Sequence, residues 1–167
     1  MRDWLADFFV NSPLRELSGQ MLRSVPGLPP ILQTIHLLGL AVLMGSIVMI
    51  CLRLLNVAAR RQDTGELMGR LFPWFFWSLP VMLFSALPFF LARPQRYIYN
   101  PVFAIKMAAL ATALGLSFWL WQRFRHANAD MQNWLTRGLA IACLAAWVTT
   151  AMGGRWIAYA DYLFWPG

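Results

Sequence analysis

Three ionisable side chains interrupt long apolar stretches of the chain: His36, Lys106 and Arg155. Such residues are costly inside a bilayer and are therefore candidates for a functional site. His36 lies five residues into its stretch, Lys106 lies four residues into another, and Arg155 lies four residues before the end of a third. With a helical rise of about 1.5 Å per residue, each would lie roughly 6–8 Å below the same membrane face. The sequence therefore predicts a layer to which three helices contribute one nitrogen-bearing side chain each.

No acidic residue accompanies this predicted layer. Segments 17–62 and 67–129 contain no Asp or Glu, and the nearest acid by depth, Asp161, follows the last apolar stretch. Two cations and a histidine without an internal counter-ion should attract a haem propionate, a quinone oxygen, a lipid phosphate or a small anionic solute. The alternative is that Lys106 and Arg155 extend to the interface and that His36 is a hydrogen-bonded packing residue.

Neighbouring polar residues extend the candidate site. Gln33 lies about one helical turn before His36 and is near enough to orient its ring. Tyr99 and Asn100 precede the third apolar stretch and are placed to cover the layer from its membrane face. All three are therefore included among the candidate binding residues.

Haem can be considered from the available ligands. A bis-histidine site is not expected, because the only other histidine, His126, falls at the opposite membrane face. A His–Met pair is possible, since Met107 lies at the depth of His36 and Met152 lies one turn deeper. Haem b and a quinone are therefore the two cofactors that the candidate site favours.

Copper is a less favoured interpretation. Cu(I) prefers Met, His and Cys ligands, which here would be His36 together with Met49, Cys51 and Cys143. A freestanding enzyme is not expected, because paired carboxylates, di-iron ligands, a Gly-rich phosphate loop and a nucleophile elbow are all missing.

The composition shows which elements must position these residues. The chain has 167 residues, of which 59% are hydrophobic and 13% charged, and its mean hydropathy is +0.53. A soluble domain is about 45–50% apolar and about 25% charged, so a membrane protein is indicated. The net charge is +7, but the Arg residues lie mostly at the ends of apolar stretches, where they anchor membrane helices. A nucleic-acid partner is therefore not expected, whereas the lipid bilayer is.

Four stretches are long enough to cross a hydrocarbon core, which needs about 20 helical residues. They cover residues 31–55, 71–92, 102–121 and 137–159. Backbone groups find no water in lipid, so these segments should be helices, and their short connections favour an antiparallel bundle. The predicted fold is thus all-α: a four-helix transmembrane domain over residues 26–167.

Residues 1–25 form a separate amphipathic arm. Trp4 and Phe8 recur at helical spacing beside Asp3 and Asp7, and a second start signal follows at segment 11–13. The arm either lies in the bilayer interface or packs against the bundle as a lid.

Small residues predict which helix faces meet. His36 shares a face with Gly39 and Ser46, and Lys106 shares one with Ala113 and Ser117. Because small residues let membrane helices approach closely, we expect these two faces to pack against each other.

The distribution of Arg predicts the orientation. The loops after the first and third stretches carry seven Arg residues, and the opposite side carries five. The positive-inside rule then places both termini outside, in the periplasm of a Gram-negative host.

Several short strings also point to a family. Segments 35–40, 52–55, 99–106 and 154–159 resemble a family of uncharacterised four-helix bacterial inner-membrane proteins, which is distantly similar to the membrane domain of copper-resistance protein D. The resemblance covers about residues 28–160. The signature positions that it implies are His36, Arg53, Asn100, Lys106 and Arg155.

This chain departs from the family pattern at two places. Family members commonly have Asp where this chain has Cys51, and a Gly in the middle of the second span, where this chain has segment 85–88. The family supplies no settled activity, so the function is predicted from the site.

The sequence thus predicts a small inner-membrane protein whose cationic pocket binds haem or quinone and supports electron transfer. One alternative is a non-catalytic accessory subunit held in a larger membrane complex, or a homo-oligomer. Another is a small transporter of copper or of an anionic solute.

Overall fold

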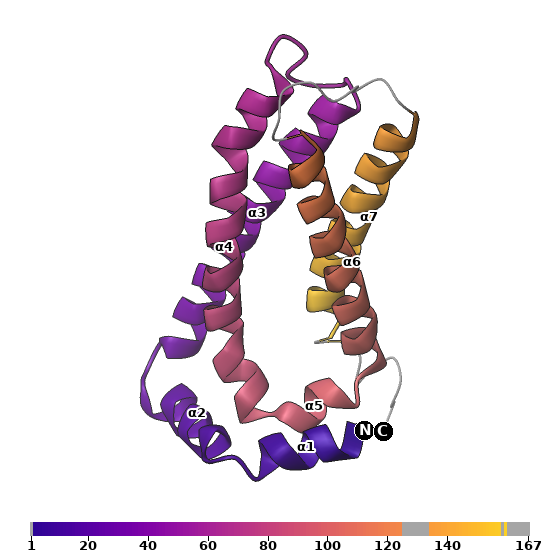
Figure 1. The fold of residues 1–167 in the computed structure, drawn as a ribbon. Coiled ribbons are helices and arrows are strands. Elements are labelled where there is room, and N and C mark those ends of the chain that lie inside the picture. The colour runs from indigo at the N-terminus through magenta and orange to yellow at the C-terminus, as the bar shows by residue number, and fades with distance from the viewer. Residues whose placement is uncertain (1, 125–133, 158, 160–167) are drawn as a thin grey trace.

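The computed structural model describes residues 2–124, 134–157 and 159, which form seven helices and contain no strand. His126 and Asp161 lie outside the described residues. The helices follow one another along the chain (Figure 1) as α1 (Arg2–Val10), α2 (Pro13–Ser24), α3 (Leu28–Leu54), α4 (Thr64–Ala92), α5 (Pro94–Ile98), α6 (Pro101–Phe124) and α7 (Trp134–Trp156).

Four of these helices, α3, α4, α6 and α7, are long and apolar enough to cross a membrane. The predicted fold class, an all-α polytopic membrane protein, is therefore confirmed over the described residues. α4 begins earlier than the apolar stretch predicts, because the Asp63 side chain accepts a hydrogen bond from the Glu66 backbone N–H and caps a polar first turn.

The spanning helices form two hairpins, α3–α4 and α6–α7 (Figure 1). α3 and α4 are joined by a loop at one end of the bundle, where Arg53 Nε donates to the Gln62 carbonyl and Asn56 and Ala59 adopt positive φ. We call this end the Arg60 end. α5 connects the two hairpins at the opposite end, which we call the α5 end.

The apolar core that joins the two hairpins lies toward the Arg60 end. We call this set of buried side chains the core cluster; it comprises Leu43, Ile47, Ile50, Cys51, Leu54, Met68, Phe72, Phe75, Ala113, Leu120, Phe124, Ala140, Cys143 and Trp147. Toward the α5 end, the buried apolar set in the described residues shrinks to Val102 and Ile157 with Tyr97 and Phe103 around them. The hairpins are thus held together mainly at one end, and their ribbons diverge toward the other (Figure 1).

The small-residue faces pack differently from the prediction. A Cβ added to Gly39 would lie 3.0 Å from Met82 Cγ, so this face of α3 meets α4. Ser117 of α6 accepts a hydrogen bond from the Trp147 indole of α7 at 2.9 Å. The prediction that the faces of α3 and α6 meet is wrong, because short connections pair each helix with its neighbour in the chain.

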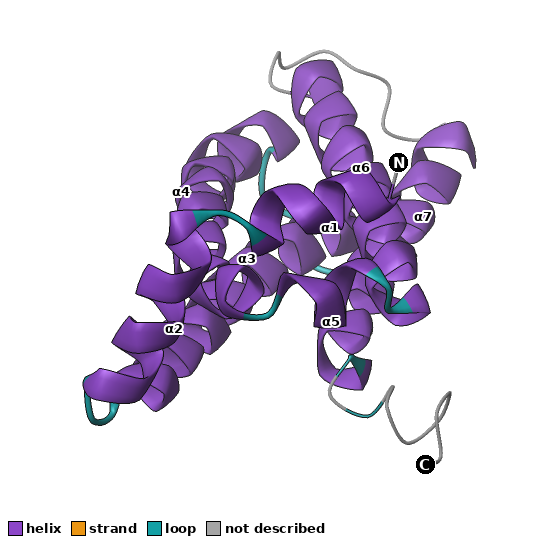
Figure 2. Ribbon diagram, turned by 90° about the horizontal axis from the view of Figure 1, so that it is seen from below, coloured by secondary structure: helices purple, strands orange, loops and turns teal. Residues whose placement is uncertain are grey.

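The N-terminal arm packs across the α5 end (Figures 1 and 2). α2 contacts α4, α1 contacts α5, and the Phe9 ring lies edge-on to Phe90 at 5.3 Å. Ser12 caps α2 by accepting from the Leu14 N–H. The sequence left open whether the arm lies in the bilayer interface or packs on the bundle as a lid. These contacts favour the lid.

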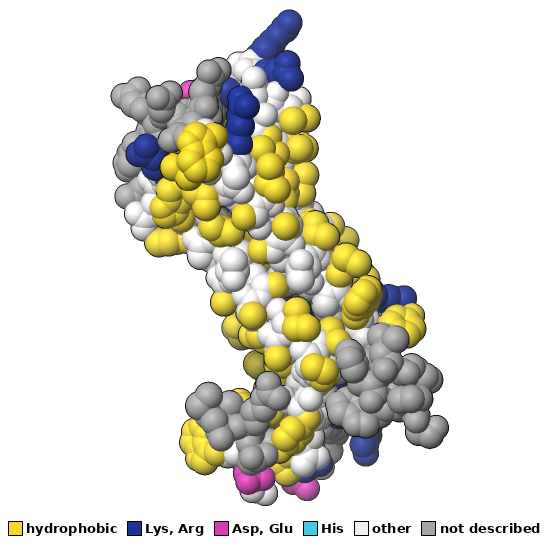
Figure 3. Space-filling view, turned by 90° about the vertical axis from the view of Figure 1, so that its right-hand side faces the viewer, with side chains coloured by type: hydrophobic (Ala, Val, Ile, Leu, Met, Phe, Trp, Pro, Cys, Tyr) yellow, Lys and Arg dark blue, Asp and Glu magenta, His cyan; other side chains and the backbone are white. Residues whose placement is uncertain are grey.

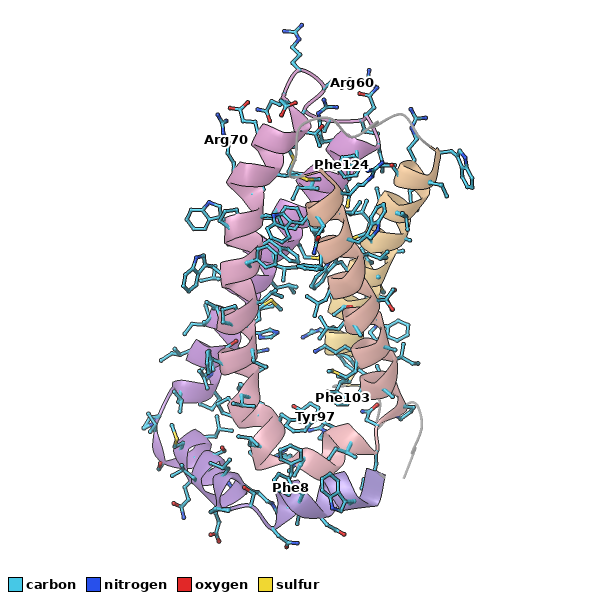
Figure 4. All side chains as sticks on the ribbon, viewed as in Figure 1. Phe8, Arg60, Arg70, Tyr97, Phe103 and Phe124 are labelled. Carbon is cyan, nitrogen blue, oxygen red and sulfur yellow. The ribbon has the colours of Figure 1, made fainter. Side chains whose placement is uncertain are left out.

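Hydrophobic side chains cover most of the middle of the molecular face that Figure 3 shows, and Lys and Arg side chains gather at its upper end. This upper end is the Arg60 end, where Arg60 and Arg70 are also labelled in Figure 4. An apolar middle and a basic end are the pattern expected of a membrane-embedded bundle.

We predict that Gly39→Val lowers the stability of the protein by about 1–3 kcal/mol, since the added methyl groups overpack the contact with Met82. Gly45→Val is the matched control, because Gly45 lies on the same helix and has no neighbouring atom within 4 Å of an added Cβ. Thermal unfolding in detergent measures the difference, and equal melting temperatures for the two variants would contradict the α3–α4 packing.

Candidate functional site

The His36 ring is held by α4. Its Nδ1 lies 3.1 Å from the Met82 carbonyl oxygen and 3.0 Å from Ser85 Oγ. Ser85 donates its own proton to the same carbonyl, at 3.0 Å. Since a carbonyl only accepts, Nδ1 carries a proton and donates it. In the neutral ring the other nitrogen, Nε2, is therefore an acceptor, and it has no hydrogen-bond partner among the described residues.

The part of α4 that meets His36 lies between two prolines. Pro80 and Pro88 lack a backbone N–H, so the carbonyls of Phe76 and Phe84 lose their usual helical donors. The helix nevertheless continues through both prolines to Ala92. α4 therefore has two backbone carbonyls without their usual helical donors in and beside the stretch that meets His36.

Lys106 lies against two glycines of α7. A Cβ added to Gly153 would lie 3.0 Å from Lys106 Cβ, and one added to Gly154 would lie 3.4 Å from Lys106 Nζ. The missing side chains let the lysine lie close along α7. Lys106 is also near enough to His36 for the two side chains to interact electrostatically. These two predicted residues, which lie on different hairpins, are thus within electrostatic range of each other.

Acidic partners do not neutralise this pair in the described spanning helices. Their one acidic residue is Glu66, which starts α4 at the Arg60 end and forms a salt bridge with Arg70. Within the described part of the chain, Lys106 has no ion-pair partner. A hydrogen-bonding cation and an imidazole acceptor thus lie near each other without a carboxylate.

The sequence places Arg155 at the same membrane depth as His36 and Lys106, but its side chain points elsewhere. Its side chain is exposed, and its guanidinium carbon lies 5.7 Å from the centre of the Tyr159 ring. Gln33 is also exposed, and the hydrogen bonds of His36 in the described residues go to α4 instead. His36 and Lys106 thus lie within electrostatic range of each other, whereas Arg155 and Gln33 remain on the exposed surface.

The methionines considered as haem ligands are both exposed, Met107 by 44% and Met152 by 49%. Met107 follows Lys106 directly on α6, and Met152 precedes Gly153 on α7. The described His, Cys, Asp and Glu residues form no group of three or more that could hold a metal ion. A metal would therefore depend on His36 and on methionine.

Asn100 lies immediately before α6 and is 3% exposed. Its side-chain oxygen accepts from the Val102 N–H at 2.9 Å, so it caps the helix that carries Lys106. Its amide nitrogen is buried and has no hydrogen-bond partner in the described structure. Tyr99, next to it, is exposed. Asn100 thus positions α6 and retains a buried donor.

Aromatic rings close the α5 end. We call Phe9, Phe90, Tyr97 and Phe103 the aromatic cluster; the Phe90 and Phe103 rings stack at 5.9 Å, and the Tyr97 ring lies 5.6 Å from Phe103. Figure 4 labels Tyr97 and Phe103 between the two hairpins. Burial raises the pKa of the Tyr97 hydroxyl, although nearby Arg96 and Arg93 oppose this effect. The tyrosine therefore stays protonated at neutral pH.

Sequence reasoning missed three parts of this site: the Met82 carbonyl, Ser85, and the Gly153–Gly154 seat. The glycine pair is visible in the sequence directly before Arg155 and was a usable signal. A backbone carbonyl carries no side-chain signal, and nothing in the spacing links Ser85 to His36. These contacts require the structure.

The fold and this site define a polytopic four-helix membrane protein in which a His–Lys pair lies between two hairpins. The chain belongs to the family of unknown function DUF6644, whose model matches residues 24–160. The predicted membership in an uncharacterised family is thereby confirmed. No curated protein and no solved structure matches the chain.

We predict that neutral His36 is the tautomer protonated at Nδ1, because Met82 and Ser85 hold that proton. Nitrogen NMR of protein labelled in histidine, in mildly alkaline buffer, distinguishes the protonated from the unprotonated ring nitrogen. His36→Gln assigns the signal, and Ser85→Ala should keep the same tautomer because the Met82 carbonyl remains. A proton found on Nε2 would contradict the hydrogen-bond assignment.

Proposed function

We propose that this protein binds the polar head group of a molecule dissolved in the membrane, and that this molecule is a quinone. The observation that carries the proposal is that His36 and Lys106, on two different hairpins, lie within electrostatic range of each other with no carboxylate beside them in the described residues. Within the described part of the chain, neither the free acceptor of His36 nor the cation of Lys106 has a partner. A ligand is the natural partner for both.

The chemistry of the pair suits a quinone and its reduced form. Lys106 donates hydrogen bonds only, which matches a quinone carbonyl oxygen. Neutral His36 offers an acceptor at Nε2, which matches the hydroxyl of a quinol. A site with one donor and one acceptor binds both redox forms, which supports a role in electron transfer.

The surroundings of the pair favour a ligand that is already in the bilayer. The aromatic cluster lies toward the α5 end, and the core cluster lies toward the Arg60 end. Both are apolar, so a water-soluble anion would have to cross one of them. A molecule with an apolar tail reaches the helices from the side instead.

Haem b is the second candidate ligand, and one observation favours it. A histidine that ligates a metal usually donates its other ring N–H to a carbonyl or a carboxylate, as His36 does to Met82. Met107 or Met152 would supply a second ligand to the iron, and Lys106 and Arg155 would hold the propionates. An absorption spectrum of the purified protein separates haem from quinone.

We also propose that the protein lies in a bacterial inner membrane with both termini in the periplasm. Support comes from the Arg-rich loop at the Arg60 end and from the resemblance to the membrane domain of copper-resistance protein D. A second copy or other membrane subunits would cover the exposed aromatic side chains of α4, among them Trp74 and Trp77.

Removing either member of the pair should weaken quinone binding. We predict that Lys106→Leu raises the Kd for a short-tailed ubiquinone about 10–100-fold, since a hydrogen bond to a charged group contributes about 1.5–3 kcal/mol. His36→Leu should raise the Kd for the corresponding ubiquinol about 2–10-fold, since a hydrogen bond between neutral groups contributes about 0.5–1.5 kcal/mol. Titration of the protein in nanodiscs, followed by quenching of tryptophan fluorescence, measures the Kd.

Arg137→Leu is the matched control for quinone binding, because it removes an exposed cation at the other end of α7. Its Kd should equal that of the wild type, and all variants should elute and melt alike. Quinone binding that is absent in the wild type, or unchanged in both site variants, would overturn the proposal. A colourless protein that binds no quinone would favour the accessory-subunit alternative.

The proposed orientation predicts opposite accessibilities of two exposed positions. Gln95→Cys, in α5, should react with a membrane-impermeant maleimide in intact cells whose outer membrane admits the reagent. Arg60→Cys should react only after the inner membrane is opened. Both native cysteines are buried, so they contribute no background. The reverse labelling pattern would place the termini in the cytoplasm.

A further inference from the structure

The outward face of α6 carries a hollow that the proposed quinone site does not use. We call it the α6 hollow; it is lined by Gly115, Phe118, Trp119, Gln122 and Arg123. These residues follow the three- and four-residue spacing of one helix face. The other face of α6 packs into the core cluster, where Ala113, Leu120 and Phe124 are buried. The α6 hollow therefore opens on the surface of a helix that is long and apolar enough to span a membrane.

Gly115 leaves the space at the apolar end of the α6 hollow. A Cβ added to Gly115 would meet no atom within 4 Å. Side chains of a helix point back toward its N-terminal turn, so Phe118 and Trp119, one turn further on, border the gap. Both rings are exposed, Phe118 by 49% and Trp119 by 43%. The hollow has a volume of about 500 Å³, which is within the range of about 300–1,000 Å³ found for ligand clefts.

Arg123 and Gln122 form the polar end of the α6 hollow. Arg123 lies one residue before the end of α6, which is at the Arg60 end of the bundle (Figure 4). It lies about 12 Å from Gly115 along the helix axis. Neither Arg123 nor Gln122 has a hydrogen bond or an ion pair with another described residue. The hollow thus combines a free cation at a helix end with an apolar groove that leads toward the middle of the span.

We propose that the α6 hollow binds one anionic phospholipid. Its phosphate lies against Arg123 and Gln122, and one acyl chain lies over Gly115 between the two rings. The guanidinium group suits a phosphate because it donates hydrogen bonds in a planar fork, and the Gln122 amide adds two further donors. The inference is independent of the quinone proposal, since Lys106 lies near the opposite end of α6.

A lipid suits the α6 hollow better than a second copy of the chain. Copies inserted in one membrane share their orientation, so a symmetric contact through this face would bring two Arg123 side chains to the same level. Like charges at one level repel each other, and none of the described residues that line the hollow is acidic. An anionic lipid instead supplies the negative charge that the hollow lacks.

Native mass spectrometry of the full-length protein, released from nanodiscs, tests the proposal. The nanodiscs contain equal amounts of phosphatidylglycerol and phosphatidylcholine with the same acyl chains. We expect the wild type to retain one phosphatidylglycerol about 3–6-fold more often than one phosphatidylcholine, as for one arginine near a membrane surface. Arg123→Gln should retain the two lipids equally. An excess of inorganic phosphate should leave the wild-type preference unchanged, which distinguishes a lipid from a free anion.

Matched controls exist for both ends of the α6 hollow. Arg61→Gln removes an exposed cation at the same end of the bundle but outside the hollow, so it should keep the preference. Gly115→Leu fills the hollow and should lower the retention of both lipids, whereas Gly138→Leu, in equally open surroundings on α7, should not.

Four results would overturn the lipid proposal. They are equal retention of both lipids by the wild type, an equal loss of preference in Arg61→Gln and Arg123→Gln, displacement of the lipid by inorganic phosphate, and a change of oligomeric state without a change of lipid retention in Gly115→Leu. The last result would assign the hollow to a second copy of the chain. Melting temperatures equal to that of the wild type show that each variant is folded.

Discussion

The partnering of polar groups within the protein is the constraint on which this structure depends, because a bilayer supplies no water to satisfy them. His36 meets the constraint through the Met82 carbonyl and Ser85 of α4. Trp147 of α7 meets the constraint by donating its indole N–H to the Ser117 hydroxyl of α6. Lys106 has no acidic partner among the described residues, so it is the polar group of the bundle whose partner would have to be a ligand.

The same constraint explains why the fold consists of two hairpins with unequal ends. Glycines allow close approach within each hairpin: Gly39 admits Met82, and Gly153 admits Lys106. Large apolar side chains, such as Phe72, Phe75 and Trp147, fill the junction between the hairpins toward the Arg60 end. Toward the α5 end the buried apolar set of the described residues is smaller, and ring contacts such as that of Phe90 with Phe103 join the hairpins there instead of a comparable core.

Hydropathy predicted the fold class and the spanning segments, since both depend on the length and apolarity of each segment alone. Depth along a helix was also predictable, and His36 and Lys106 lie within electrostatic range of each other. The rotation of each helix about its axis was not predictable, because it depends on which neighbouring helix it packs against. That is why the α3 and α6 faces were paired wrongly. The direction of Arg155, whose side chain lies over Tyr159, was not predictable for the same reason.

The packing of α3 on α4 also limits how the His36 site can change. Gly39 packs on Met82, and the His36 ring bonds to the carbonyl of the same residue, so α3 and α4 are fixed to each other at this level. A movement of α3 as a rigid rod would therefore carry α4 with it. The spacing between His36 and Lys106 would change only if the α3–α4 hairpin moved as a whole against the α6–α7 hairpin.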